Sequence, residues 1–316
     1  MKNVLIRCDA SKDIGLGHIT RCLVLANKFR NDGHHVYFAI KNYEITIEKL
    51  KEQKFDMLIA EDNFDYFNWI ESIIEEKQID IFIGDIRDGF PVELITFMKN
   101  RNILTVAIDE PSSYAKERDL CFYPPHANID KSKYKGKVFQ GLEYVILRDE
   151  FYERFEKKKN EIPNILVMMG GTDAYNLTLP VIKKLDSYNE KFMISVILSD
   201  NHKDIKVLND FIKISNHKID IYNKVDNMSF FLNNIDFAIS QFGTVVYEYL
   251  IKNIPTIYIY NKKESIKSYS YFIQNEYGIL SEVSNIDIQK LLNLSYEKID
   301  ITSRIYDFIK KGEYEI

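Results

Sequence analysis

The sequence alternates short apolar runs with amphipathic segments along nearly its whole length, and this alternation strongly limits its fold. An apolar run of about five residues is typical of a strand buried in a sheet, whereas a longer amphipathic segment is typical of a helix packed against it. Strands separated by helices predict parallel βαβ units. We expect strands at residues 3–7, 35–40, 56–60, 80–84 and 104–108, and helices at 19–31, 66–77 and 92–101.

The second half of the chain repeats this pattern. After a predicted helix at residues 147–159, a new series of strands is expected at residues 165–169, 193–198, 219–222, 237–240 and 256–260. A chain of 316 residues is longer than one typical core supports. We therefore predict an α/β protein of two Rossmann-like, doubly wound domains, residues 1–158 and 159–316, which face a ligand cleft at the carboxyl ends of their strands.

Composition excludes several classes of protein. The net charge of −5 provides no basic field, which argues against a nucleic-acid partner. No apolar run reaches the roughly 18 residues of a membrane span, and Arg7 and Asp9 interrupt the first apolar stretch, unlike a signal peptide. Cys8, Cys22 and Cys121 are odd in number and lack metal spacing, so reduced thiols and a cytoplasmic location are expected. We expect a monomer with no metal and no cofactor.

A glycine turn follows the first predicted strand, at residues 15–18 (Gly-Leu-Gly-His). A turn between a strand and a helix gathers free backbone N–H groups at a helix N-terminus, where an anionic ligand is favoured. His18 stands where the helix begins, and an imidazole is the commonest general base near neutral pH. Alternatively, Gly15 and Gly17 only form a tight turn, and His18 caps the helix or packs beneath it.

Charged residues follow two other predicted strands of the first half. Asp85 comes after the strand at 80–84, and Asp109 follows the strand at 104–108. Such carboxylates hold sugar hydroxyls or orient a histidine, but they also cap the helices that follow. Arg87 either pairs with Asp88 or meets a phosphate of the ligand.

Two glycine turns in the second half have the chemistry of a diphosphate site. Small and hydroxyl residues at a helix N-terminus present backbone donors to phosphate, and a glutamate one turn further accepts hydrogen bonds from a ribose. The alternative is an ordinary βα turn with that glutamate exposed. The residues predicted to bind the nucleotide are Gly170, Gly171, Thr172, Asp173, Gly243, Thr244 and Glu248.

These motifs together resemble one family. Residues 7–11 and 14–21 are similar to the N-terminal signature of the UDP-sugar hydrolases of the pseudaminic-acid pathway and their spore-coat polysaccharide relatives. Further matches follow in the same order at residues 141–144, 147–151, 169–173 and 240–248. The resemblance covers most of the chain and implies a GT-B-like fold.

The resemblance also implies an activity. The family hydrolyses UDP-2,4-diacetamido-2,4,6-trideoxy-β-L-altropyranose to the free sugar and UDP, with inversion and without a metal. The position that matches the water-activating histidine is His18. From the first-domain motifs we predict the substrate-binding residues Asp9, Gly15, Gly17, Arg21, Asp85, Arg87 and Asp109.

The chain departs from the family pattern at two places. Residues 85–88 read Asp-Ile-Arg-Asp where the hydrolases carry Asp-His-Tyr, and Tyr247 stands where they place an asparagine. One alternative is therefore a GT-B glycosyltransferase, in which an acceptor hydroxyl replaces water. Another is a nucleotide-sugar-binding subunit without activity. Release of free sugar from a panel of UDP-, CMP- and GDP-sugars, without acceptor, separates these readings.

Overall fold

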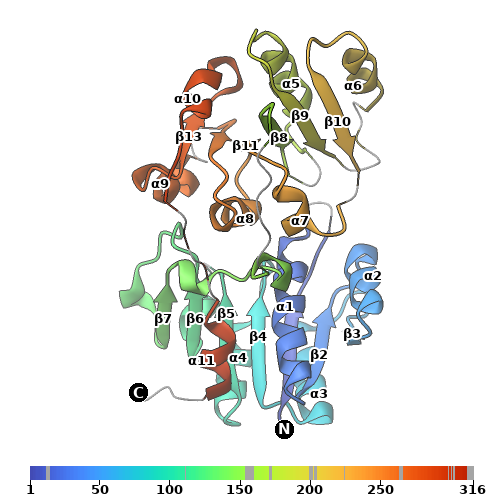
Figure 1. Ribbon diagram of the computed structural model, residues 1–316. Helices are drawn as coiled ribbons and strands as arrows, with labels where there is room; N and C mark the ends of the chain where they lie inside the picture. The colour runs from blue at the N-terminus through green and yellow to red at the C-terminus, as the bar shows by residue number, and fades with distance from the viewer. Residues whose placement is uncertain are drawn as a thin grey trace. The chain divides into compact units, whose positions relative to one another are not determined.

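The computed structural model divides the chain into two compact units, shown in Figure 1: Met1–Arg148 with Ile301–Ile316, and Asp149–Asp300. The structure describes residues 1–11, 15–110, 112–153, 160–170, 173–198, 202, 205–223, 225–262, 266–297, 299, 301 and 303–311.

The first unit contains a parallel sheet that, in the described residues, has seven strands in the order β3-β2-β1-β4-β5-β6-β7. Its strands are β1 (Asn3–Cys8), β2 (His35–Ile40), β3 (Asp56–Ile59), β4 (Ile81–Asp85), β5 (Leu104–Ile108), β6 (Leu120–Tyr123) and β7 (Lys137–Gln140). Its helices are α1 (Gly17–Asn31), α2 (Glu44–Glu52), α3 (Tyr66–Lys77), α4 (Val92–Lys99) and α11 (Ile305–Lys311), with the 3-10 turns η1 (Tyr114–Glu117), η2 (Lys131–Lys133) and η3 (Leu142–Tyr144).

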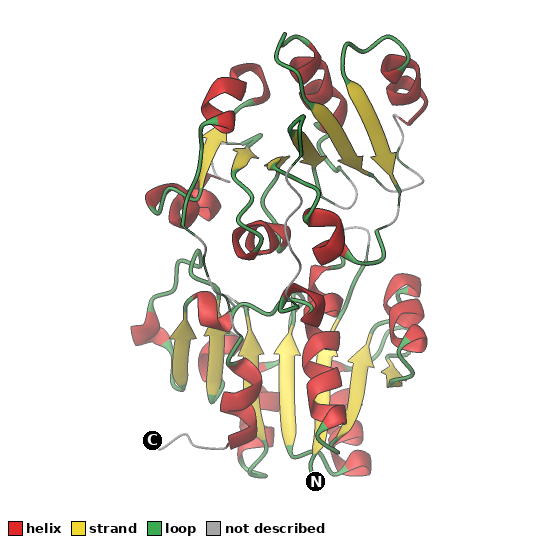
Figure 2. Ribbon diagram, viewed as in Figure 1, coloured by secondary structure: helices red, strands yellow, loops and turns green. Residues whose placement is uncertain are grey.

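Side-chain alternation along the strands explains why helices cover both faces of this sheet, as Figure 2 shows. Val4 and Ile6 of β1 point to one face and join a core with residues of α1 and α11. Leu5 points to the other face and packs with residues of α3 and α4. A strand buried on both faces needs apolar side chains in both directions, which is why consecutive residues 4–6 of β1 are all apolar. Because all the strands are parallel, their carboxyl ends meet at one edge.

The second unit has the same design, with six described strands in the order β10-β9-β8-β11-β12-β13, all parallel. Its strands are β8 (Asn164–Met168), β9 (Met193–Ile197), β10 (Lys218–Tyr222), β11 (Phe237–Ser240), β12 (Thr256–Ile259) and β13 (Gly278–Ser281). Its helices are α5 (Thr178–Asp186), α6 (Ile205–Ile212), α7 (Met228–Leu232), α8 (Val245–Ile251), α9 (Ile266–Gln274) and α10 (Ile288–Leu292), with the 3-10 turns η4 (Asp149–Phe151) and η6 (Val283–Asn285).

The elements predicted from apolar periodicity are present with small shifts at their ends, but β6, β7 and β13 were not predicted. The predicted helix at residues 147–159 also differs. Its described part forms only the short turn η4, and residues 154–159 lie outside the described residues. The carboxylate of Glu150 accepts hydrogen bonds from the backbone N–H groups of Met228 and Ser229, so this segment is tied to the start of α7.

The boundary between the units also differs from the predicted one. Chain contacts place it after Arg148 rather than after residue 158, and Ile301–Ile316 returns to the first unit. Ile305 and Ile309 of α11 lie in the first unit's core, and the Phe308 ring is 4.8 Å from that of Phe139. A short C-terminal helix gives no sign in the sequence of which core its apolar face will join.

Candidate active site

The glycine turn after β1 leads into α1, of which His18 is the second residue. Gly15 has a backbone φ of +82°, a conformation that favours glycine, and its N–H donates to the carbonyl of Ser11 over 2.8 Å. Leu16 stands at the N-cap but makes no side-chain capping bond. The imidazole of His18 therefore lies at the carboxyl edge of the sheet, with 15% of its side chain exposed.

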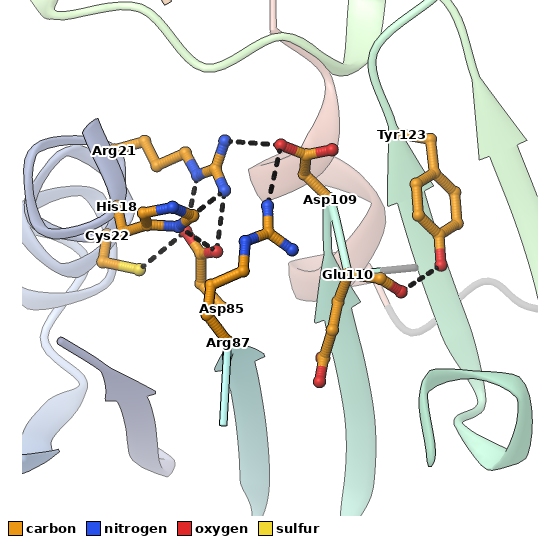
Figure 3. Close-up of polar contacts among 8 residues, drawn as sticks. All are labelled: His18, Arg21, Cys22, Asp85, Arg87, Asp109, Glu110 and Tyr123. Carbon is orange, nitrogen blue, oxygen red and sulfur yellow. Dashed lines mark hydrogen bonds and ion pairs between the residues drawn. The ribbon is translucent and has the colours of Figure 1, made fainter. Parts of the chain in front are cut away.

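A buried carboxylate holds the imidazole of His18, as Figure 3 shows. Its Nδ1 lies 2.7 Å from Oδ1 of Asp85 and 3.0 Å from Nη2 of Arg21. A guanidinium has only donors and an ionised carboxylate has only acceptors, so Nδ1–H donates to Asp85 and the Arg21 contact is not a hydrogen bond to His18. This arrangement fixes the Nδ1–H tautomer and leaves the lone pair of Nε2 to accept a proton.

Asp85 is the centre of this cluster, and its side chain has no exposed surface. Its Oδ2 accepts from Nε of Arg21 at 2.5 Å, and its Oδ1 accepts from Nη2 at 2.7 Å, which is a bidentate pair. Burial alone opposes ionisation, but Arg21 and His18 outweigh it and hold the pKa of Asp85 well below its usual range. In this structure Asp85 orients His18 and is not exposed to a sugar hydroxyl, which differs from its predicted role as a substrate ligand.

Asp109 links two arginines at the end of β5. Its Oδ2 accepts from Nη1 of Arg21 at 2.9 Å and from Nη2 of Arg87 at 3.3 Å, and both contacts are visible in Figure 3. Its backbone has a φ of +48°, a left-handed conformation that is uncommon outside glycine. Ser113, not Asp109, stands at the N-cap position of the turn η1 that follows, and it makes no side-chain capping bond. The structure thus brings four predicted residues around His18: Arg21, Asp85, Arg87 and Asp109.

Asp9 belongs to a different network. Its Oδ2 lies 2.6 Å from Nη1 of the buried Arg7, and its Oδ1 accepts from the backbone N–H of Lys41. Asp88 forms ion pairs with both Arg7 and Lys41. The predicted pairing of Asp88 with Arg87 is therefore not the one that the structure shows. The carboxylate of Asp9 joins the ends of β1 and β2, which differs from its predicted role as a substrate ligand.

A glutamate and an arginine close to the cluster are fully buried against each other. Nη2 of Arg118 lies 3.8 Å from Oε2 of Glu110, and neither side chain has exposed surface. The guanidinium of Arg118 occupies the space that a side chain at Gly84 would need, because a Cβ there would lie 2.9 Å from Nη2. Burial raises the pKa of Glu110 to about 8, although Arg118 acts in the opposite direction. Figure 3 shows the Glu110 carboxyl directed away from Asp109.

Two residues that were not among the predicted site residues, His126 and Glu110, lie near the cluster in the structure. Burial lowers the pKa of His126, and the charges of Asp109 and Arg21 also act on its imidazole. His126 follows β6 and two prolines, and β6 was not among the predicted strands. Glu110 adjoins Asp109 in sequence, but no local pattern reveals its partner Arg118.

The predicted nucleotide residues of the second unit follow two neighbouring strands. Ser240 of β11 is in register with Met168 of β8, so the turns after both strands start at the same edge of the sheet. Gly170 has a φ of +78° and open space where a Cβ would lie. Gly171 and Thr172 lie outside the described residues.

The carboxylate of Asp173 binds groups of the protein itself. It accepts hydrogen bonds from the N–H groups of Leu177 and Thr178 at 2.8 and 2.9 Å, and Nε2 of His202 lies 3.3 Å from it. The side chain thereby satisfies backbone donors at the start of α5, where free N–H groups otherwise occur. Asp173 is 2% exposed, which differs from its predicted role as a nucleotide ligand.

The turn after β11 remains compatible with a ligand. A Cβ on Gly243 would meet no atom within 4 Å, and Thr244 stands at the N-cap of α8 without a side-chain capping bond. Glu248 lies in α8 and is 8% exposed, so the alternative of an exposed glutamate is wrong. Tyr247 is buried, and its ring lies 5.4 Å from that of Phe272.

Within the described ranges, no group of three or more His, Cys, Asp or Glu side chains is arranged to hold a metal ion. Among the same residues, no helix combines the length and the apolar character needed to cross a bilayer.

Two curated proteins are similar to this chain in sequence. The chain matches no protein-family model. It is 29% identical to the uncharacterized protein MJ1062 of Methanocaldococcus jannaschii, over 98% of this chain and 68% of that protein. It is 27% identical to the UDP-2,4-diacetamido-2,4,6-trideoxy-beta-L-altropyranose hydrolase of Campylobacter jejuni, over 78% of this chain and 88% of that protein.

Two solved structures extend the comparison to the fold. MurG of Acinetobacter baumannii superposes with a TM-score of 0.71 at 12% identity and full coverage of both chains. The calicheamicin glycosyltransferase CalG4 superposes with a TM-score of 0.65 at 10% identity, over 98% of this chain and 92% of that one. The fold class predicted from the sequence, two Rossmann-like α/β domains of the GT-B type, is therefore confirmed.

Proposed function

We propose that the chain is a nucleotide-sugar hydrolase that releases free sugar and UDP from a UDP-(diacetamido-trideoxy) sugar, for nonulosonic-acid or surface-polysaccharide biosynthesis. The observation that carries this proposal is the contact of His18 Nδ1 with the buried carboxylate of Asp85. It leaves Nε2 as a base at the carboxyl edge of the sheet, where ligands of open α/β sheets bind. The name of the Campylobacter jejuni relative supports the choice of substrate.

The proposed reaction needs one proton acceptor. Nε2 of His18 takes a proton from water as the water oxygen bonds to the anomeric carbon, and the bond from that carbon to the UDP oxygen breaks with inversion. Asp85 stabilises the imidazolium that forms, while Arg21 keeps the carboxylate ionised and in place. The proton leaves His18 for solvent after turnover.

The departing diphosphate gains negative charge, which preorganised donors stabilise. We assign this role to backbone N–H groups of the turns after β8 and β11, through Gly170, Gly243 and Thr244, with Glu248 on the ribose. Gly171 and Thr172 complete the predicted set. Because the Asp173 carboxylate already binds backbone donors, we assign it to the shape of the turn.

A glycosyltransferase is the second candidate, because CalG4 has the same fold. The test is incubation with UDP-, CMP- and GDP-sugars without acceptor, followed by ¹H and ³¹P NMR. Release of free sugar with UDP supports the hydrolase. Turnover that appears only after an acceptor is added supports the transferase.

The role of His18 is tested by His18→Gln, with His35→Gln as the matched control, since His35 is exposed at the amino end of β2. Glutamine keeps a hydrogen bond to Asp85 but cannot take the proton. We expect the rate to fall by about a hundredfold to ten-thousandfold in His18→Gln, with unchanged folding, and no loss in the control. Equal rates at saturating substrate would end this mechanism.

A further inference from the structure

Arg87 has unused hydrogen-bonding capacity beside His18. Its Nη2 contacts Oδ2 of Asp109 at 3.3 Å, a long contact to an oxygen that Arg21 already binds at 2.9 Å. Among the residues that the structure describes, Arg87 has no second hydrogen-bond partner. Arg21, in contrast, donates hydrogen bonds to both Asp85 and Asp109. Most N–H donors of the Arg87 guanidinium are therefore available to a ligand.

Arg87 is also more exposed to solvent than Arg21. The Arg87 side chain is 32% exposed, compared with 13% for Arg21 and 0% for Asp85. In Figure 3 its guanidinium stands beside that of Arg21 at the Asp109 carboxylate. Asp85 and the shared oxygen of Asp109 already accept from arginines, so this part of the cluster offers donors to a ligand rather than acceptors.

The electrostatics of α1 favour the same ligand chemistry. The 15-residue helix begins at this cluster, with no side-chain cap and no acidic residue in its first turn. Its N-terminal N–H groups and its dipole therefore add positive potential that no carboxylate of that turn offsets.

We propose that Arg87 binds an anionic oxygen group of the substrate next to His18. For the uncharged diacetamido-trideoxy sugar proposed above this group is a phosphate of the nucleotide, and for an acidic sugar it is the sugar carboxylate. The choice of UDP-sugars as ligands rests on the proposed function. Guanidinium matches both groups with paired N–H donors. Loss of such a charge-assisted contact weakens binding by about tenfold to a hundredfold.

The first test compares Arg87→Gln with wild type by isothermal titration calorimetry, using UDP, UDP-N-acetylglucosamine and UDP-N-acetylglucosaminuronic acid. Arg101→Gln is the matched control, because Arg101 is also exposed with one long ion pair, 3.5 Å to Glu75, before the amino end of β5. A loss for the uronic acid alone identifies a sugar carboxylate. An equal loss for all three ligands identifies a phosphate. Affinities within twofold of wild type for every ligand overturn the proposal.

A second measurement does not depend on nucleotide binding. Phenylglyoxal modifies accessible arginines, and peptide mass spectrometry reports the extent at Arg87 and Arg101 in the intact chain. We expect inorganic phosphate or acetate to slow modification of Arg87 several-fold and to leave Arg101 unchanged. If wild type binds none of the three UDP ligands, the proposed function fails. Protection of Arg87 would then still support the anion subsite, and equal reactivity with and without the anions would overturn it.

Discussion

We expect the buried carboxyl of Glu110 to make the stability of the first unit depend on pH, and Glu110→Gln to remove the part of that dependence that comes from Glu110. Burial raises the pKa of Glu110 from 4.5 to about 8. Between these values the folded unit holds a proton that the unfolded chain has released, so raising the pH favours unfolding. Stability from this group is complete below pH 4.5 and is lost as the pH rises through the folded pKa.

The magnitude follows from that linkage. One bound proton of difference corresponds to a slope of about 1.4 kcal/mol per pH unit. Between about pH 5.5 and about pH 7.5, the free energy of unfolding of wild type should therefore fall by about 3 kcal/mol relative to that of Glu110→Gln. Glutamine resembles the protonated acid in shape and charge, so the two proteins should be similar in stability at the acid end.

The chain provides a reporter for this unit. Its single tryptophan, Trp69, lies in α3 of the first unit, so urea unfolding followed by tryptophan fluorescence follows that unit. Glu117→Gln is the control, because Glu117 forms a surface pair with Lys135. The reasoning would be refuted if the difference in free energy of unfolding between wild type and Glu110→Gln stayed constant with pH or grew toward acid pH.

Two further predictions concern the cluster around His18. Asp85→Asn leaves the largely buried guanidinium of Arg21 with only Asp109 as an anionic partner among the described residues. We therefore expect the free energy of unfolding of the first unit, measured in urea, to fall by roughly 3 kcal/mol and turnover to fall as well. An active variant with wild-type stability would contradict this. Because the proposed mechanism uses His18 as the base and backbone N–H groups for the leaving group, EDTA should leave the rate of sugar release unchanged, and a loss that Mg²⁺ or Mn²⁺ restores would refute the mechanism.

Apolar periodicity predicted most strands, because a strand buried on both faces needs apolar side chains in both directions. β6, β7 and β13 were not predicted. β7 and β13 are the end strands of their sheets and are only partly buried, so they need not be apolar throughout. Parallel strands also explain why residues distant in sequence, such as Arg21 and Asp109, were predicted for one site. The carboxyl ends of parallel strands meet at one edge of the sheet whatever the lengths of the connecting helices.

The roles of individual carboxylates were not predictable in this way. Asp9, Asp85 and Asp173 each follow a strand and look alike in sequence. The structure buries Asp9 against Arg7, Asp85 against Arg21, and Asp173 against backbone donors of α5. Which acid is buried depends on neighbours brought from distant elements.

The sequence by itself therefore determined the parallel α/β class, the glycine turn with His18, and the edge of the sheet where polar residues gather, because these depend on local periodicity and on strand direction. Only the tertiary structure decided that His18 Nδ1 meets Asp85, that Arg118 lies against Gly84, and that α11 returns to the first unit. Those contacts join residues far apart in the chain, and their energies depend on burial, which no local pattern encodes.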